Sequence, residues 1–365
     1  MIDVLGSLAL ILASVVILAV VTDRFFIPSL DAISTRLKLS DEVAGASLMA
    51  MGSSAPELAI ALMALFSGGG QHSDVGIGTI VGSAVFNILV ITGVSAVVAG
   101  GLHIHVYAVR RDIFYYLVSI GYLALVFFDG HVSLIEAVLG LVGYFFYLVF
   151  LALFRIALVY FKKTEDDYDE VAAGAIEADE HESAALFLWH RFEAFVAGVL
   201  GRLIGPPDRN FVWAFVVSIA LIIALSYILV EATIVFSAGI GIPPVIVALT
   251  LLAAGTSAPD LIASVDVARA GRGGMAVANA VGSNTFDLLI GLALPWTVAL
   301  AFQGLSGINV GTGDLWISIG ILVATTLILF VFLETKRDLS RREGWILLLL
   351  YAVFVIYTLA SGTAV

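Results

Sequence analysis

The sequence predicts an all-α membrane protein with ten transmembrane helices arranged as two inverted five-helix repeats. Three observations predict this fold: the composition, the positions of the basic residues and a motif that occurs twice. Of the 365 residues, 61% are hydrophobic and only 13% are charged. Soluble globular proteins carry about 25% charged residues. Because a helix needs about 20 apolar residues to cross a bilayer, the chain has room for about ten spans.

The apolar segments define the expected spans in order. They fall at about 4–22 (extending as a long helix toward 37), 42–66, 76–99, 112–129, 132–160, 211–238, 243–268, 275–302, 314–333 and 343–361. The residues before the first segment lack the positive charge of a signal peptide, so we expect this segment to be a retained span. The absence of cysteine excludes disulfides and thiolate metal sites.

Basic residues predict the orientation. All 17 Lys and Arg residues fall in connections that lead from an odd-numbered span to an even-numbered one, such as Arg110 and Arg111 after the third span. Cytoplasmic connections collect Lys and Arg. We therefore expect both termini outside, the central region in the cytoplasm, and a location in the cell (plasma or inner) membrane.

The central polar region divides the chain into a first half at 1–161, a linker at 162–209 and a second half at 210–365. Residues 165–182 are rich in Asp and Glu, which indicates a solvated flexible linker. A low-affinity calcium lure is the alternative, although the spacing of a Ca²⁺ loop is missing. Residues 184–203 carry apolar side chains at helical spacing and precede Pro206 and Pro207. This pattern predicts an interfacial amphipathic helix.

Two passages of the sequence match each other. Gly52–Leu58 (GSSAPEL) is followed by Gly82–Asn87 (GSAVFN), and Gly255–Leu261 (GTSAPDL) is followed by Gly282–Asp287 (GSNTFD). The first pair belongs to a repeat at about 42–98, and the second to a repeat at about 243–302. Because each half has an odd number of predicted spans, the two copies enter the membrane in opposite directions. Inverted repeats with interrupted helices at the midplane are typical of secondary transporters.

The residue types at the repeats suit a cation. Pro56 and Pro259 interrupt their spans and free backbone carbonyl oxygens. Carboxylates and hydroxyls stand beside each break: Glu57, Ser53 and Ser54 in the first repeat, Asp260, Thr256 and Ser257 in the second. Calcium takes 6–8 oxygen ligands, and sodium, of similar size, can use the same oxygens. Intramembrane carboxylates at these positions and at Asp287 need counter-charge, which mobile cations or protonation supply, because the predicted spans place no Lys or Arg at that depth.

Other polar residues have mostly structural interpretations. We expect Gly82 and Gly282 to permit close helix packing. Glu231 either gates the ion path, binds ions or makes a structural hydrogen bond. The remaining candidates are expected to be structural acids near span ends (Glu136 and Asp266), a surface charge (Asp112) and cytoplasmic loop residues (His103 and His105, with proton sensing as the alternative).

These passages resemble the two α-repeats of the cation/calcium exchanger superfamily, and most closely its potassium-dependent sodium/calcium exchanger branch. The resemblance rests on Phe25–Leu30, Leu39–Ala46, Val75–Leu89, Met275–Asp287 and Leu294–Trp296. It implies an antiporter in which sodium influx expels calcium by alternating access, with spans one and six sliding past the core. The calcium, sodium and potassium ions are the transported substrates, and the lipid bilayer is the expected surroundings. We expect no enzyme activity, no bound cofactor, no nucleic acid and no obligate protein partner.

The resemblance also implies the ligand set. Glu57 and Asp260 would be the central calcium ligands, and an acid at Asp287 is associated in this family with potassium co-transport. The other implied ligands are the side chains of Asn87, Ser53, Ser54, Thr256, Ser257, Ser83 and Ser283 and the backbone of Ala50 and Ala253.

Three rival functions remain open from the sequence. A calcium/proton antiporter of the same superfamily could use Glu57 as proton carrier, although that branch usually shows an Asn-Ala-Ala-Glu type motif. A passive cation channel is disfavoured by the inverted repeat. An intramembrane hydrolase is disfavoured because the chain has no His-Glu-x-x-His or Gly-x-Ser-x-Gly stretch.

Overall fold

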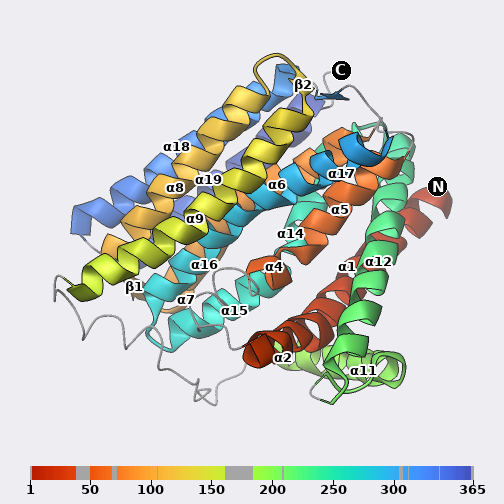
Figure 1. The fold of residues 1–365 in the computed structure, drawn as a ribbon, viewed down its shortest axis with the longest axis horizontal. Helices are drawn as coiled ribbons and strands as arrows, with labels where there is room; N and C mark the ends of the chain where they lie inside the picture. The colour runs from red at the N-terminus through yellow and green to blue at the C-terminus, as the bar shows by residue number, and fades with distance from the viewer. Residues whose placement is uncertain are drawn as a thin grey trace.

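The computed structural model describes residues 2–37, 50–67, 72–104, 106–160, 184–207, 209–303, 307–310, 312–336 and 338–362. Its described part is helical apart from two short strand pairs (Figure 1). The acidic stretch at 165–182 and His105 lie outside the described residues, as does the start of the expected span at 42–66.

The helices of the first half follow the predicted spans. One long helix runs through α1 (Ile2–Val21), the π-helical η1 (Thr22–Phe26) and α2 (Ile27–Leu37). The rest of the half consists of α4 (Ala50–Ser53), α5 (Ala55–Phe66), α6 (Ser73–Phe86), η4 (Asn87–Ile91), α7 (Thr92–Val98), α8 (Val106–Val126) and α9 (Leu134–Tyr160).

The second half repeats this order after the linker helix α11 (Ala184–Ile204). Its elements are α12 (Phe211–Ile240), α13 (Pro244–Val247), η5 (Ala248–Leu252), α14 (Ala253–Thr256), α15 (Ala258–Arg269), α16 (Gly273–Phe286), η6 (Asp287–Gly291), α17 (Ala293–Gln303), α18 (Thr312–Lys336) and α19 (Arg341–Gly362).

Seven helices in the described part are long and apolar enough to cross a membrane, and an eighth span is added if the bent pair Pro244–Thr256 and Ala258–Arg269 counts as one. The expectation of ten also includes α5 and α8. The first has 12 residues, and the second carries Arg110, Arg111 and Asp112 in its first turns.

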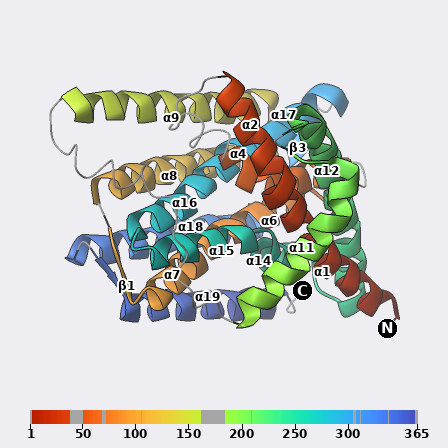
Figure 2. The ribbon, with the colours of Figure 1, turned by 90° about the horizontal axis from the view of Figure 1, so that it is seen from below.

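Burial separates a central pair of helices from a lipid-facing shell. The candidate span Ser73–Val98 is 89% buried inside the protein, whereas Leu134–Leu151 and Arg341–Ser361 are each 22% buried. Phe145 and Phe146 of α9 are among the exposed apolar side chains. Figure 2 shows α1, α2, α11 and α12 on one side of the molecule and α8, α9 and α18 on the other.

Two antiparallel strand pairs, which the sequence does not predict, tie connections from the two halves together. β1 (Gly101–His103) pairs with β4 (Asp338–Ser340), and β2 (His131–Val132) pairs with β3 (Ile308–Asn309). The labels of β1 and β2 lie at opposite ends of the helices, and both chain termini lie toward the β2 end (Figure 1).

Two acids of the predicted spans, Glu136 and Glu231, make local or inter-helix hydrogen bonds. Glu136 accepts hydrogen bonds from the Ser133 backbone N–H at 2.8 Å and from its hydroxyl at 2.7 Å. Since Glu136 is also the third residue into the helix, this is a capping box, and the structural expectation is confirmed. On α12, Glu231 accepts a 2.5 Å hydrogen bond from Ser67, which ties this helix to the end of α5.

Candidate functional site

The site begins at two equivalent breaks. Ser54 separates α4 from α5 with φ −90° and ψ 6°, and Ser257 separates α14 from α15 with φ −85° and ψ 1°. In the second repeat the two helices meet at 45°. Pro56 and Pro259 follow two residues later. Because proline has no N–H, neither can donate to the carbonyl four residues earlier, so each break lacks one helical hydrogen bond where the sequence predicts it.

Hydroxyl pairs join the two repeats at these breaks. Ser54 Oγ lies 3.2 Å from Ser283 Oγ, and Ser83 Oγ lies 2.8 Å from Ser257 Oγ. Ser54 corresponds to Ser257 in the repeat, and Ser83 corresponds to Ser283. Each broken helix therefore bonds the Gly-Ser motif of the opposite repeat, as expected of two halves related by an approximate two-fold axis.

The three predicted acids are buried around these hydroxyls. Glu57 is 2% exposed, Asp260 8% and Asp287 0%. Asp260 Oδ2 accepts a long 3.5 Å contact from Ser283. Glu57 interacts with Thr256 and Ser257 and with the charge of Asp260, and Asp287 interacts with the charges of both other acids. The repeats therefore bring all three acids into one electrostatic group.

This group is not a cluster of carboxylates alone. Among the described residues, no three His, Cys, Asp or Glu side chains lie in an arrangement that could hold a metal ion. Any ion at this place must draw on hydroxyl, amide and backbone oxygens as well as on the carboxylates.

Several of the buried oxygens lack partners. Glu57 Oε2, Asn87 Oδ1 and both carboxylate oxygens of Asp287 are inaccessible and make no hydrogen bond within the described part of the chain. Asn87 uses its amide nitrogen on Asn284 Oδ1 at 3.0 Å, and Asn284 in turn donates to the Ala84 carbonyl at 3.0 Å. Buried polar atoms without partners are rare and costly, so these oxygens need a ligand.

The structure places the other predicted ligands at or beside the two breaks. Ser53 is half-buried and lines a cavity that Asp260 also lines. The Thr256 hydroxyl donates to the Leu252 carbonyl at 3.1 Å, which leaves its oxygen lone pairs available. The Ala253 carbonyl already accepts the Ser257 N–H at 3.1 Å. Ala50 begins α4.

Each repeat changes to a π-helical turn at the site, a feature that the sequence analysis missed. The turn η4 begins at Asn87 and η6 begins at Asp287, which are equivalent positions in the repeat. Single π-helical turns frequently occur at functional sites because they change which way side chains point. Both turns therefore begin at predicted ligand positions.

A cavity of about 710 Å³ reaches Asp260 from one side. Its lining includes Asp260 and Ser283 of the site, together with Asp23, Arg24, Arg111 and Glu193. Glu193 belongs to the linker helix α11 and Arg111 to the start of α8. The cavity thus opens toward the end of the molecule where α11 lies.

Arg24 belongs to the part of the first helix that the sequence predicts to extend toward residue 37. Arg24 lies in η1, within the continuous helix from residue 2 to residue 37, and it lines the same cavity as Asp260. The sequence signal for this position was the Asp23-Arg24 pair, which lies between apolar stretches of the same helix. The expectation that the spans place no Lys or Arg at the depth of the acids stays a prediction.

The two motif glycines differ. A Cβ at Gly82 would lie 2.3 Å from the Leu249 carbonyl oxygen and 2.7 Å from Ala253 Cβ, so the close packing expected there is confirmed. The same expectation for Gly282 is wrong, since no described atom lies within 4 Å of a Cβ there and Gly282 lines the cavity. The packing is therefore closed in one repeat and open in the other.

Asp112 is not the predicted surface charge. It is 4% exposed and accepts a 2.8 Å hydrogen bond from Arg111 Nε. Its position inside the helix bundle buries it, whereas the sequence shows only its basic neighbours. An exposed pair joins His103 Nδ1 and Asp338 Oδ1 at 2.7 Å, across the β1–β4 ladder.

Comparison with known proteins identifies the fold and family. The family described as sodium/calcium exchanger protein matches residues 7–153 and 210–360. The chain belongs to this family. It is thus a multi-pass membrane transporter of the cation/calcium exchanger superfamily, as the resemblance implies. The match omits residues 154–209, which include the linker helix.

Curated relatives of the exchanger are sodium/potassium/calcium exchangers. It is 29% identical to the human sodium/potassium/calcium exchanger 3, with 94% of this chain and 78% of that protein covered. Identity to the human sodium/potassium/calcium exchanger 5 is 31%, with 92% and 79% covered. These relatives place the exchanger closest to the potassium-dependent branch.

Solved structures share its fold. The sodium-calcium exchanger NCX_Mj, soaked with Na⁺ and Sr²⁺, superposes with a TM-score of 0.55 at 22% identity, covering 97% of this chain and 99% of that one. Native YfkE superposes with a TM-score of 0.63 at 17% identity, covering 98% and 95%.

Proposed function

We propose that the exchanger expels Ca²⁺ in exchange for Na⁺ by alternating access, with Ca²⁺ bound between the two broken helices. The observation that carries this proposal is the set of unpartnered, inaccessible oxygens on Glu57, Asn87 and Asp287. Uncompensated carboxylate charge in a protein interior is strongly unfavourable. A travelling cation neutralises that charge and supplies the missing partner at the same time.

The proposed ligands divide by role. Glu57 and Asp260, which stand next to the two breaks, are the central calcium ligands. The serine hydroxyls that pair across the repeats can turn their lone pairs to the ion, and Ser53 provides oxygen on the cavity side. Calcium accepts such a mixture of carboxylate, hydroxyl and carbonyl oxygens. Sodium ions at the same oxygens would restore the neutral site after calcium leaves.

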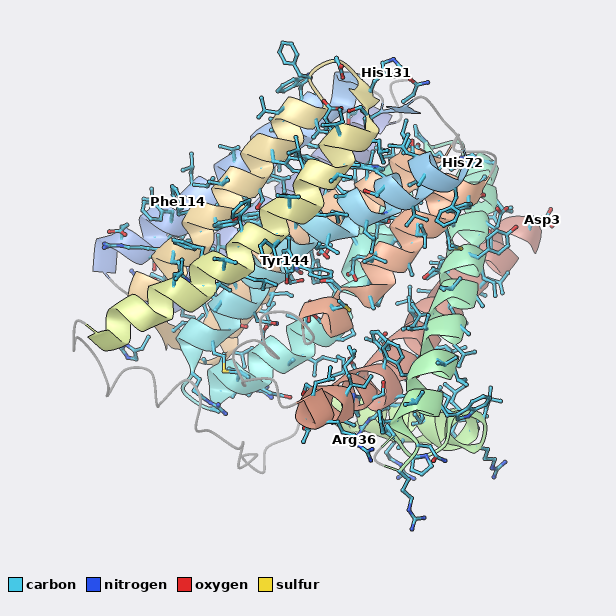
Figure 3. All side chains as sticks on the ribbon, in the orientation of Figure 1. Asp3, Arg36, His72, Phe114, His131 and Tyr144 are labelled. Carbon is cyan, nitrogen blue, oxygen red and sulfur yellow. The ribbon has the colours of Figure 1, made fainter. Side chains whose placement is uncertain are left out.

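We propose ten spans in two inverted halves, in the cell membrane, with both termini outside. The strand pairs support this arrangement, because each joins connections predicted on the same side. His72 and His131 lie at one end and Arg36 at the other (Figure 3). Since the chain has no cysteine, His72→Cys should react with an impermeant maleimide from outside and Arg209→Cys only after permeabilisation. The reverse pattern would overturn the orientation.

With this orientation, the cavity beside Asp260 opens to the cytoplasm. The tight contact at Gly82 lies on the opposite repeat, and the open space at Gly282 lies on the cavity side. The described conformation therefore corresponds to the state that collects cytoplasmic Ca²⁺.

Isotope flux tests the proposal against the proton antiporter and the channel. Proteoliposomes loaded with sodium should take up radioactive calcium when the sodium gradient is imposed, and a proton gradient alone should not drive uptake. Uptake driven by protons would favour the calcium/proton antiporter. Flux that persists without any counter-ion would indicate a channel.

Asp287 is the proposed determinant of potassium co-transport. Its carboxylate is fully buried and unpartnered, so an extra monovalent cation would compensate its charge. We expect Asp287→Asn to make sodium-driven calcium flux independent of potassium, because a neutral amide no longer needs that ion. The measurement is flux with potassium varied at fixed sodium. If wild-type flux does not depend on potassium, the assignment of Asp287 is refuted, and the rest of the proposed function is not affected.

A further inference from the structure

The linker helix contributes a buried carboxylate to the wall of the ion cavity. Glu193 of α11 is 7% exposed, although the sequence places it on the polar face of an interfacial helix. Its two oxygens accept hydrogen bonds from Arg24 Nε at 2.5 Å and from Arg24 Nη2 at 3.0 Å. Bidentate pairing of this kind fixes the guanidinium in position.

Two further carboxylates, Asp23 and Asp260, line the same cavity as Arg24. The charge of Asp23 interacts both with that of Arg24 and with that of Asp260, so Asp23 links the two. The second arginine of the cavity, Arg111, is held by Asp112 at 2.8 Å. Within the described ranges, Asp260 has no ion-pair partner. Both arginines that line the cavity are therefore bound to buried carboxylates, and the Asp260 carboxylate remains available to the transported ion.

An arginine released from Glu193 would act as a competitor for the site. The guanidinium carries a permanent positive charge on a long side chain, and half of the Arg24 side chain surface is exposed. Attraction between opposite charges in a cavity with low-dielectric walls is strong. A cation tethered near Asp260 would neutralise the carboxylate that calcium needs and would also repel the entering ion.

We infer that Glu193 is a positioning residue that holds Arg24 away from Asp260 and thereby keeps the cytoplasmic path open to calcium. This inference rests on the proposed exchange function. It gives the linker helix a part in transport, because the residue that restrains Arg24 comes from the linker and not from either repeat.

The test uses the full chain in proteoliposomes, with Glu193→Gln, Arg24→Gln and the double variant. Glu193→Gln should weaken the apparent calcium affinity on the cytoplasmic face about tenfold and change the opposite face much less. The double variant should regain wild-type affinity to within about twofold, because the competing charge is gone. Arg24→Gln alone should stay near wild type.

A matched control is Glu334→Gln, which breaks another bidentate Arg–Glu pair, that of Arg110 and Glu334, outside the cavity lining. It should leave the affinity unchanged on both faces. Normal affinity of Glu193→Gln would overturn the inference, as would a double variant that folds but binds as weakly as the single one. If Glu193→Gln does not fold, a double variant that folds but binds calcium weakly still overturns the inference. A wild type without sodium-driven flux would refute the function instead.

Discussion

Replacing Glu57 by Gln or Asp260 by Asn is expected to abolish sodium-driven calcium exchange while the protein still inserts and folds. Each change keeps the shape of the side chain and removes one charge from the centre of the site. Hydrogen bonds and contacts to a charged group are worth about 1.5–3 kcal/mol, so losing one carboxylate weakens calcium binding by roughly tenfold to a hundredfold. The neutral site would also lose the charge balance with its cargo.

The measurements are isotope flux and direct calcium titration of the purified variants. Removal of an unpaired buried charge should leave thermal stability unchanged or raise it, which separates a lost site from a lost fold. Glu136→Gln is the control, because this residue caps a helix and is not among the residues that line the cavity, so it should keep full transport. Near-normal exchange by either site variant would contradict the assignment.

Gly82→Ala is expected to have the second largest effect and to differ from Gly282→Ala. A methyl group at Gly82 would overlap the Leu249 backbone oxygen at 2.3 Å, and backbone cannot turn aside as a flexible side chain does. Overpacking of this kind costs about 1–3 kcal/mol. We expect a lower unfolding temperature in detergent and a loss of most transport, because α6 can no longer lie against η5 and α14.

Gly282→Ala should keep the unfolding temperature, since no described atom lies within 4 Å of its Cβ. Its transport should nevertheless be slow. In the opposite conformation of the alternating-access cycle, the second repeat would close and bring this position into the tight contact now made at Gly82. Thermal unfolding and flux of the two variants, measured side by side, test this asymmetry. Equal unfolding temperatures for both variants would contradict it.

Local chemistry made much of the fold predictable. The lengths and positions of the apolar segments predicted the helices: the span expected at 211–238 is α12 at Phe211–Ile240. Proline chemistry placed the breaks, since Pro56 and Pro259 follow directly after the interrupted turns. The repeated motif also predicted which acids share one site, because equivalent positions in inverted halves meet at the axis between them.

Features that depend on contacts between distant segments were not predictable. The partner of Arg24 is Glu193, 169 residues later in the chain. Asp112 is buried only because other helices cover it. The π-helical turns at Asn87 and Asp287 have no composition of their own, and single sequences do not show where a helix widens by one residue.

The continuous helix from residue 2 to residue 37 is too long for the bilayer it crosses. At a rise of about 1.5 Å per residue it is about 50 Å long, whereas the hydrocarbon layer measures about 30 Å. Its far end therefore projects into water as a lever arm, where Arg36 stacks over the Phe211 ring at 4.6 Å. Any tilt of the embedded part moves this arm through a wide arc. Because the Arg24–Glu193 pair joins α11 to η1, α11 must move with it.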